Sequence, residues 1–255
     1  MRKRYLFFIA FMVLLLSQIT AAAAFKTPAE INALYYNLSE SKLQSFKCQV
    51  GVDAFDKIKE RLSPSLSEDE RQALDNIQFY LSYENGNFNF ETSGEPKFQN
   101  ENTNQGLKKV LDGIHLMVTG TFTSWKGVIA AALITGAEKY RITANKNGYV
   151  AAFQQTGNDV ELIFNKDYLV QKATYRIGNQ TIVLLPEFEA TPTGLLINKM
   201  DLNIGNGQVR EIIAIAYQDV KGIPLPASLR IKLGMGQVNQ DVTLTCSDYE
   251  VTLDQ

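Results

Sequence analysis

The segment Lys139–Leu253 decides the fold, and it opens with KYRITANKNGYVAAFQQTGNDVELIF over residues 139–164. Short runs rich in Val, Ile, Leu, Tyr and Phe alternate with Asn-Gly, Gly-Asn and Asp-containing pairs. Turn signals recur roughly every 8–12 residues, which is typical of antiparallel hairpins. We therefore expect a mainly β fold: an antiparallel sheet of about nine to eleven strands that forms an unclosed half-barrel, with helices covering its concave face.

The last two expected strands show the alternation most clearly. In the final strand the apolar parity changes between Cys246 and Tyr249, which predicts a bulge or a strong bend there. In the strand before it, one face carries Leu225, Ala227, Leu229, Ile231 and Leu233.

Residues 1–24 have the pattern of a secretory signal peptide. A basic start at residues 2–4 precedes an apolar run at Tyr5–Leu16 and small residues at Ala22–Ala24. The run is shorter than the about 20 residues of a membrane span. Cleavage and a periplasmic location are therefore expected, with an uncleaved anchor as the alternative.

The charge and length of the mature chain, residues 25–255, limit the partners and the number of domains that we expect. Removing the leader takes away three of the 25 basic residues and leaves 22 against 27 acidic residues, a net charge of −5. A mildly acidic chain has no bulk attraction to nucleic acid, so no nucleic-acid partner is expected. About 230 residues without a Gly, Ser or Pro linker predict one domain, and we expect a monomer.

Two capping boxes and one hairpin stand out before the long β segment. Thr27 with Glu30, and Ser67 with Glu70, each predict the start of a helix. Asn85-Gly86 predicts a two-residue hairpin turn that places Tyr83 opposite Phe88 and Leu81 opposite Phe90.

Two helices are expected between that hairpin and the long β segment, over residues 104–118 and 123–135. Trp125–Ile134 is apolar nearly all round, so it should face the concave side of the sheet. Glycines expected near the helix ends could permit helix displacement. They are Gly113, Gly120, Gly127 and Gly136.

The sequence gives little sign of catalysis. His115 is the one histidine, and it lies in an apolar helical stretch without a paired Ser or Cys nucleophile. A zinc site needs more His and Cys ligands than the chain offers, and no Gly-rich phosphate loop is present. We expect no catalytic residue, no metal, no cofactor and no enzymatic activity.

The two cysteines are Cys48, in the first expected strand, and Cys246, in the last. Two cysteines in an exported protein favour one disulfide, which would place these strands side by side. The alternative is two separately buried thiols, because both residues have apolar alternating neighbours.

Apolar residues of the expected strands and helices could either fill a core or line a cavity that holds lipid. For any single aromatic residue, core packing is favoured over cavity lining. The candidate ligand-binding residues are Phe79, Leu81, Phe88, Phe90, Leu111, Ile114, Trp125, Ile129, Leu133, Phe153 and Phe164.

The order of elements resembles a known family. Lys42–Phe46 enters the first strand, Gly222–Pro226 precedes the penultimate strand, and Tyr249–Val251 closes the chain. Together with the leader and the helical interruption, this resembles the periplasmic lipoprotein-carrier (LolA/LolB-like) superfamily and its relatives among outer-membrane lipoprotein-sorting proteins. The resemblance implies an unclosed antiparallel barrel with helices on its concave face, and an apolar cavity that binds acyl chains without catalysis.

Two functions follow as expectations. The first is an exported soluble protein that binds lipid or lipoprotein acyl chains and carries them across the periplasm, with an envelope membrane protein as a candidate partner. The alternative is a structural or interaction module of the cell envelope with the same fold and a filled core.

Overall fold

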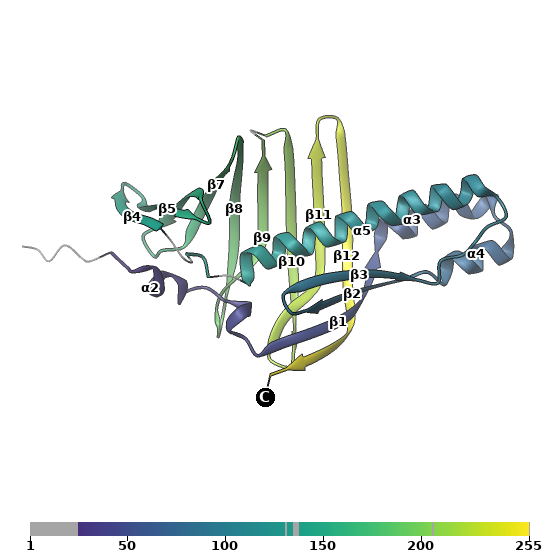
Figure 1. Ribbon diagram of the computed structural model, residues 1–255, viewed down its shortest axis with the longest axis horizontal. Helices are drawn as coiled ribbons and strands as arrows, with labels where there is room; N and C mark the ends of the chain where they lie inside the picture. Colours follow the sequence, from purple (N-terminus) through teal and green to yellow (C-terminus); the bar gives the residue numbers. More distant parts are fainter. Residues whose placement is uncertain (1–24, 131, 135–137, 206, 255) are drawn as a thin grey trace, which may run out of the picture.

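The computed structural model describes residues 25–130, 132–134, 138–205 and 207–254 (Figure 1). The expected signal peptide, residues 1–24, lies outside the described residues, as does Gly136. The described strands form one sheet of twelve, in the order β3-β2-β1-β12-β11-β10-β9-β8-β7-β6-β5-β4, and every neighbouring pair is antiparallel. β3 and β4 are the two edges, so the sheet is not closed.

The long β segment is a continuous meander from β4 to β12, as the turn spacing predicts. The sheet has one strand more than the upper end of the expected range. Its strands are β1 (Leu43–Val52), β2 (Gln78–Glu84), β3 (Asn87–Ser93), β4 (Glu138–Asn145), β5 (Gly148–Gln155), β6 (Asn158–Asn165), β7 (Val170–Ile177), β8 (Gln180–Thr191), β9 (Gly194–Ile204), β10 (Val209–Val220), β11 (Ile223–Met235) and β12 (Val238–Leu253).

The early hairpin has the expected register, with Tyr83 opposite Phe88 and Leu81 opposite Phe90. Both turn residues have positive φ, 50° at Asn85 and 79° at Gly86, as a type I′ turn requires. β1 joins this hairpin to β12, so the first and last strands of the chain lie side by side.

The expected bulge in the last strand is confirmed. Lys47 pairs with Glu250 and Gln49 pairs with Ser247, so two residues of β12 stand opposite Cys48 alone. One of them, Asp248, has a φ of 54°. The extra residue explains why the apolar parity of β12 changes after Cys246.

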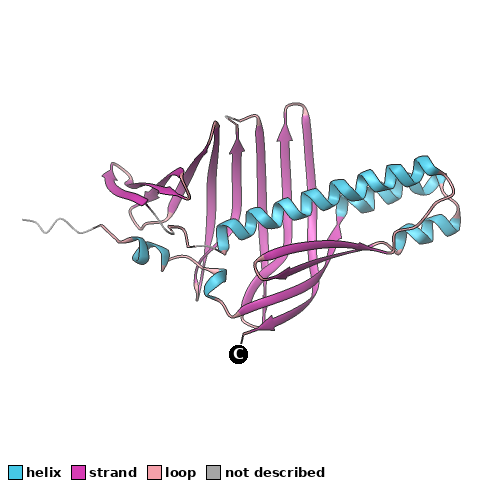
Figure 2. Ribbon diagram, viewed as in Figure 1, coloured by secondary structure: helices cyan, strands magenta, loops and turns pink. Residues whose placement is uncertain are grey.

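Both expected capping boxes are present. Thr27 and Glu30 exchange hydrogen bonds at the start of α2 (Pro28–Asn32), and Ser67 and Glu70 do so at the start of α4 (Glu68–Asp75). Between these helices lie the 3-10 turn η1 (Leu38–Glu40), α3 (Asp53–Leu62) and the 3-10 turn η2 (Ser63–Ser65). Figure 2 shows α3 and α4 projecting together beyond the sheet.

The two helices expected over residues 104–118 and 123–135 are one helix, α5 (Glu101–Ile129). Residues 119–122 contain two threonines and Gly120, and β-branched residues and glycine have low helix propensity. The Thr119 and Thr123 hydroxyls instead donate to the carbonyls of His115 and Thr119, one turn earlier, so they stay within the helix.

Helix α5 is also shorter at its end than expected. It stops at Ile129, and Asn32 binds the backbone of Ile134 through both amide atoms, at 2.8 and 2.9 Å. Of the glycines expected near helix ends, Gly127 lies in the last turn of α5, whereas Gly113 and Gly120 lie in its interior.

The N-terminal segment joins the two halves of the meander. The Tyr35 hydroxyl donates to the carbonyl of Tyr168 over 2.7 Å and accepts from the amide of Val170 over 2.8 Å, at the start of β7. Tyr36 and Leu34 share backbone hydrogen bonds with Leu195 of β9. The segment before β1 thus ties β7 to β9.

Candidate functional site

One face of the sheet carries apolar residues in rows that run across β7 to β12. Helix α5 lies across this face, and the strand ends at the top of Figure 1 extend beyond it. The row beneath α5 is closed to solvent, with Met200, Ile213, Ile231 and Val242 no more than 7 % exposed. The sheet supplies more apolar surface than α5 covers.

Two further rows lie beyond α5, and we call them the open rows. Paired residues define them, one from each successive strand. The middle row is Leu184, Leu202, Glu211, Leu233 and Gln240. The outer row is Tyr175, Ile182, Ile204, Val209 and Met235.

The open rows are apolar yet partly exposed. Leu202, Ile204, Val209 and Leu233 are half-buried, and Met235 is 53 % exposed. Scattered exposed apolar residues are normal on a protein surface, but a contiguous set marks an interaction site or a ligand groove. These rows are the strongest candidate site in the described part of the chain.

At the β7 end, the rows enter a pocket of about 230 Å³, which we call the apolar pocket. The end of α5 and the residues after it form one wall, through Val128 and Leu133, and β5 to β8 form the other. Ile177, 46 % exposed, lies at its edge. The strand residues on its wall include Val160, Val170, Ala173, Tyr175, Leu184, Pro186 and Phe188.

At the β12 end, the rows and α5 enclose a groove of about 370 Å³, which we call the helix–sheet groove. Small-molecule sites measure roughly 300–1,000 Å³ and are mostly apolar with few polar groups. The groove is lined by Gly113, Leu116, Met117, Gly120, Thr121 and Ser124 of α5 and by Glu211, Ile231, Leu233, Gln240 and Val242 of the sheet.

Glu211 is the one ionisable side chain on the wall of the helix–sheet groove. Burial among apolar neighbours raises the pKa of its carboxyl. Among the residues that the structure describes, none forms a hydrogen bond or an ion pair with this side chain. An unpaired carboxylate on this mostly apolar wall costs desolvation energy that no ion pair offsets.

The residues expected to line one ligand cavity are instead divided between two regions. In the first, the β2–β3 hairpin packs on α5: Phe88 contacts Phe122 and Trp125, with ring centroids 5.6 and 6.2 Å apart. Buried there are Phe79, Leu81, Phe90, Leu111, Ile114, Trp125 and Ile129, each at most 6 % exposed.

The second region lies between β5, β6 and the N-terminal segment. Phe153 and Phe164 are buried there, and Phe164 lies near Tyr168. Of the eleven expected residues, Leu133 lines the apolar pocket, while Phe90 and Leu111 border a separate polar pocket near the start of α5. Whether any of them contacts a ligand stays a prediction.

The open rows escaped the sequence analysis, although one signal for them was present. Leu202 and Ile204 alternate with polar residues, as in any strand with one apolar face. This pattern does not distinguish a face that another element covers from one that is exposed to solvent. The isolated Glu211 among Ile213 and Ile215 was the informative departure from the pattern.

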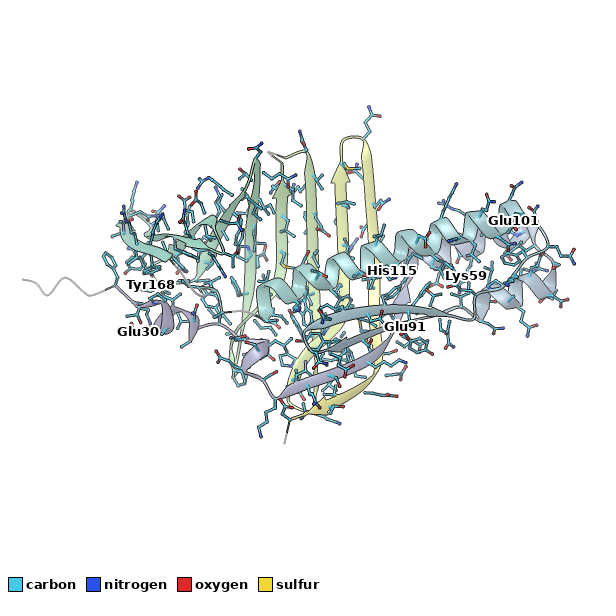
Figure 3. All side chains as sticks on the ribbon, viewed as in Figure 1. Glu30, Lys59, Glu91, Glu101, His115 and Tyr168 are labelled. Carbon is cyan, nitrogen blue, oxygen red and sulfur yellow. The ribbon has the colours of Figure 1, made fainter. Side chains whose placement is uncertain are left out.

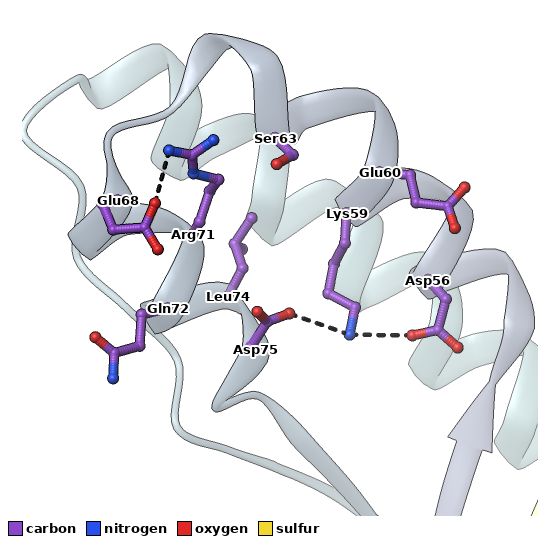
Figure 4. Close-up of a pocket in the computed structure, with 9 residues that line it drawn as sticks. All are labelled: Asp56, Lys59, Glu60, Ser63, Glu68, Arg71, Gln72, Leu74 and Asp75. Carbon is purple, nitrogen blue, oxygen red and sulfur yellow. Dashed lines mark hydrogen bonds and ion pairs between the residues drawn. The ribbon is translucent and has the colours of Figure 1, made fainter.

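The polar groove between α3 and α4 is stabilised by its own ion pairs (Figure 4). Lys59 bridges Asp56 and Asp75 at 3.0 and 3.5 Å, and Arg71 pairs with Glu68 at 2.8 Å. Of these ion pairs, Lys59–Asp75 joins the two short helices, and the other two lie within one helix each. No group of His, Cys, Asp and Glu that could hold a metal ion occurs among the residues described.

His115 lies on the exposed side of α5, where its ring meets Phe90 edge-on at 5.7 Å (Figure 3). His115 is thus an exposed helix residue that packs on one neighbouring ring. Within the described chain, no helix is both long and apolar enough to cross a membrane, α5 included.

The expected disulfide is not formed, and Cys48 and Cys246 are both free and buried. They do lie on neighbouring strands, as expected. Cys246, however, stands opposite Val50, so Cys48 is its diagonal neighbour rather than its direct partner. Diagonal residues of a sheet are about 7–8 Å apart, too far for a disulfide. The nearby Cys246 and burial both raise the pKa of the Cys48 thiol.

Comparisons of the chain with protein-family models, with curated proteins and with solved structures found no match in any of the three.

Proposed function

We propose that this protein binds the acyl chains of a lipid or lipoprotein on the open rows, between the apolar pocket and the helix–sheet groove. One observation carries the proposal: the half-exposed apolar rows continue into a recess at each of their two ends. An alkyl chain laid there would remove apolar surface from water, at about 25 cal/mol per Å² buried. The function requires binding alone and no reacting group.

The proposal agrees with the resemblance to periplasmic lipoprotein carriers. An unclosed antiparallel sheet crossed by a helix is the arrangement that this resemblance implies. In the proposal the open rows belong to the concave face, α5 and the residues after it cover part of it, and the mature protein is a periplasmic monomer. An envelope membrane protein is the partner to which the chain would deliver its cargo.

A second candidate function is a structural or interaction module of the cell envelope. It is favoured by the closed packing of the expected cavity residues, since Leu81 and Trp125 are fully buried and Ile129 is 2 % exposed. In this case the open rows receive another protein rather than a lipid.

Native mass spectrometry and lipid extraction of protein purified from its own compartment separate the two functions. The carrier should retain lipid, and Leu133→Trp, which fills the apolar pocket, should remove it with little loss of stability. Leu185→Trp is the matched control, because Leu185 is 41 % exposed and alternates with the inward Leu184 on β8. Lipid-free wild-type protein that captures no added lipid would contradict the carrier function and leave the interaction module.

A further inference from the structure

The open rows contain one carboxyl group, that of Glu211, and its position carries information about the ligand. Glu211 lies in the middle row between Leu202 of β9 and Leu233 of β11, its direct partners across the sheet. The same strand places Ile213 and Ile215 on this face, and both are buried. A carboxylate thus interrupts an apolar surface near its centre.

On the opposite face of the same strands, three acidic side chains form ion pairs. Asp201 pairs with Arg210 at 2.6 Å, Asp241 with Arg230 at 2.7 Å, and Glu187 with Lys199 at 2.5 Å. Each of these acids has a basic partner on a neighbouring strand.

Glu211 has no such partner. The residues described on the wall of the helix–sheet groove include neither lysine nor arginine, and the nearest polar neighbour in its row is two strands away, at Gln240. The carboxylate lies between apolar residues of the sheet and α5, which weakens its contact with water. A cation brought to it would gain a charge-assisted hydrogen bond, the stronger class of hydrogen bond in proteins.

We infer that Glu211 selects an amphiphile with a cationic head group, whose ammonium lies at Glu211 and whose alkyl chain lies along the open rows. This inference rests on the proposed function and narrows its ligand class. It depends on two features together: an apolar surface long enough for a chain, and a single unpaired acid at a fixed point on it. Either feature alone would leave the head group unspecified.

Isothermal titration with decylamine and decanol tests the inference, since the two probes share one alkyl chain and differ in the head group. The wild type should bind the amine about tenfold more tightly, the magnitude of one hydrogen bond to a charged group. Glu211→Gln should bind both probes equally. Glu187→Gln, an identical change on the opposite face, should keep the tenfold preference.

The outcomes separate this inference from the proposed function. Equal affinity of the wild type for both probes, or an amine preference that survives in Glu211→Gln, overturns the role of Glu211 and leaves chain binding intact. Failure of the wild type to bind either probe overturns both. Retained binding of decanol by Glu211→Gln shows that the variant is folded and its groove intact, because this probe needs only the apolar surface.

Discussion

The indole Nε1 of Trp125 donates a 3.0 Å hydrogen bond to the hydroxyl of Tyr217, which in turn donates to the carbonyl of Ile197 over 2.7 Å. This relay joins α5 to β10 and β9. Trp125 is fully buried, and burial raises the pKa of Tyr217, so both hydroxyl bonds are shielded from water. The relay holds α5 against the sheet and thereby sets which rows remain open.

Tyr217→Phe should destabilise the protein by about 1–3 kcal/mol, because it leaves the Trp125 N–H and the Ile197 carbonyl unpaired in the core. Urea unfolding measures the change. Tyr80→Phe is the control: the Tyr80 hydroxyl bonds only to Gln78 at an exposed position, so it should change stability by less than about 0.5 kcal/mol. Equal effects of the two substitutions would contradict an anchoring role for the relay.

Gly120→Ala should stabilise the protein by about 0.5–1 kcal/mol, because glycine inside a helix is less favourable than alanine. A methyl group built at this position meets no atom within 4 Å. Gly106→Ala, also free of contacts but outside the groove, should give a similar gain in thermal unfolding. If Gly120→Ala alone weakened lipid binding while raising stability, the ligand would lie against this part of the groove, because Gly120 lines its wall.

Much of the fold could be predicted because its signals are local. Asn85-Gly86 dictates a turn whatever surrounds it, and the parity change after Cys246 reports directly on the backbone of one strand. The expectation of two helices in place of α5 is wrong, although Gly120 and Thr121 do have low helix propensity. Burial of Thr121 and Phe122 against the hairpin and sheet outweighed that preference.

The candidate site was harder to predict, since it depends on which part of the sheet α5 covers. Leu81 and Leu202 both alternate with polar residues in their strands, yet Leu81 is fully buried and Leu202 is half-exposed. The difference arises because α5 and its flanking segments reach one part of the face and not the other. No local pattern of residues encodes that coverage.

Unfolded, unreduced protein should present two alkylatable thiols per chain, counted by mass spectrometry. The native protein should react slowly, because Cys48 is 1 % exposed and Cys246 is 5 % exposed. The nearby Cys246 and burial raise the pKa of Cys48, which further suppresses its thiolate. A chain without free thiols would mean that β1 and β12 shift in register to bring the two residues into direct opposition.

Acidification should change the stability contributed by two carboxyls on neighbouring strands, those of Glu211 and Asp201, in opposite directions. Burial raises the pKa of Glu211 in the folded protein, so the folded state holds this proton more tightly than the unfolded state. The stability that this group contributes is therefore lost as the pH rises from the ordinary glutamate pKa, about 4.3, through the raised pKa of the folded protein. Glu211→Gln should raise the melting temperature near neutral pH, and the gain should vanish below about pH 4.

Asp201 provides the control with the reverse sign. The hydrogen bonds from Arg210 hold the pKa of the Asp201 carboxyl below its usual range. The stability that this carboxylate contributes is therefore present above the ordinary aspartate pKa, about 3.9, and is lost as the pH falls through the lowered pKa of the folded protein. Asp201→Asn should lower the melting temperature near neutral pH, with a penalty that shrinks on acidification. If Glu211→Gln instead lowered the melting temperature at neutral pH, Glu211 would have an intramolecular cationic partner, and the carboxylate would not be free to receive a ligand.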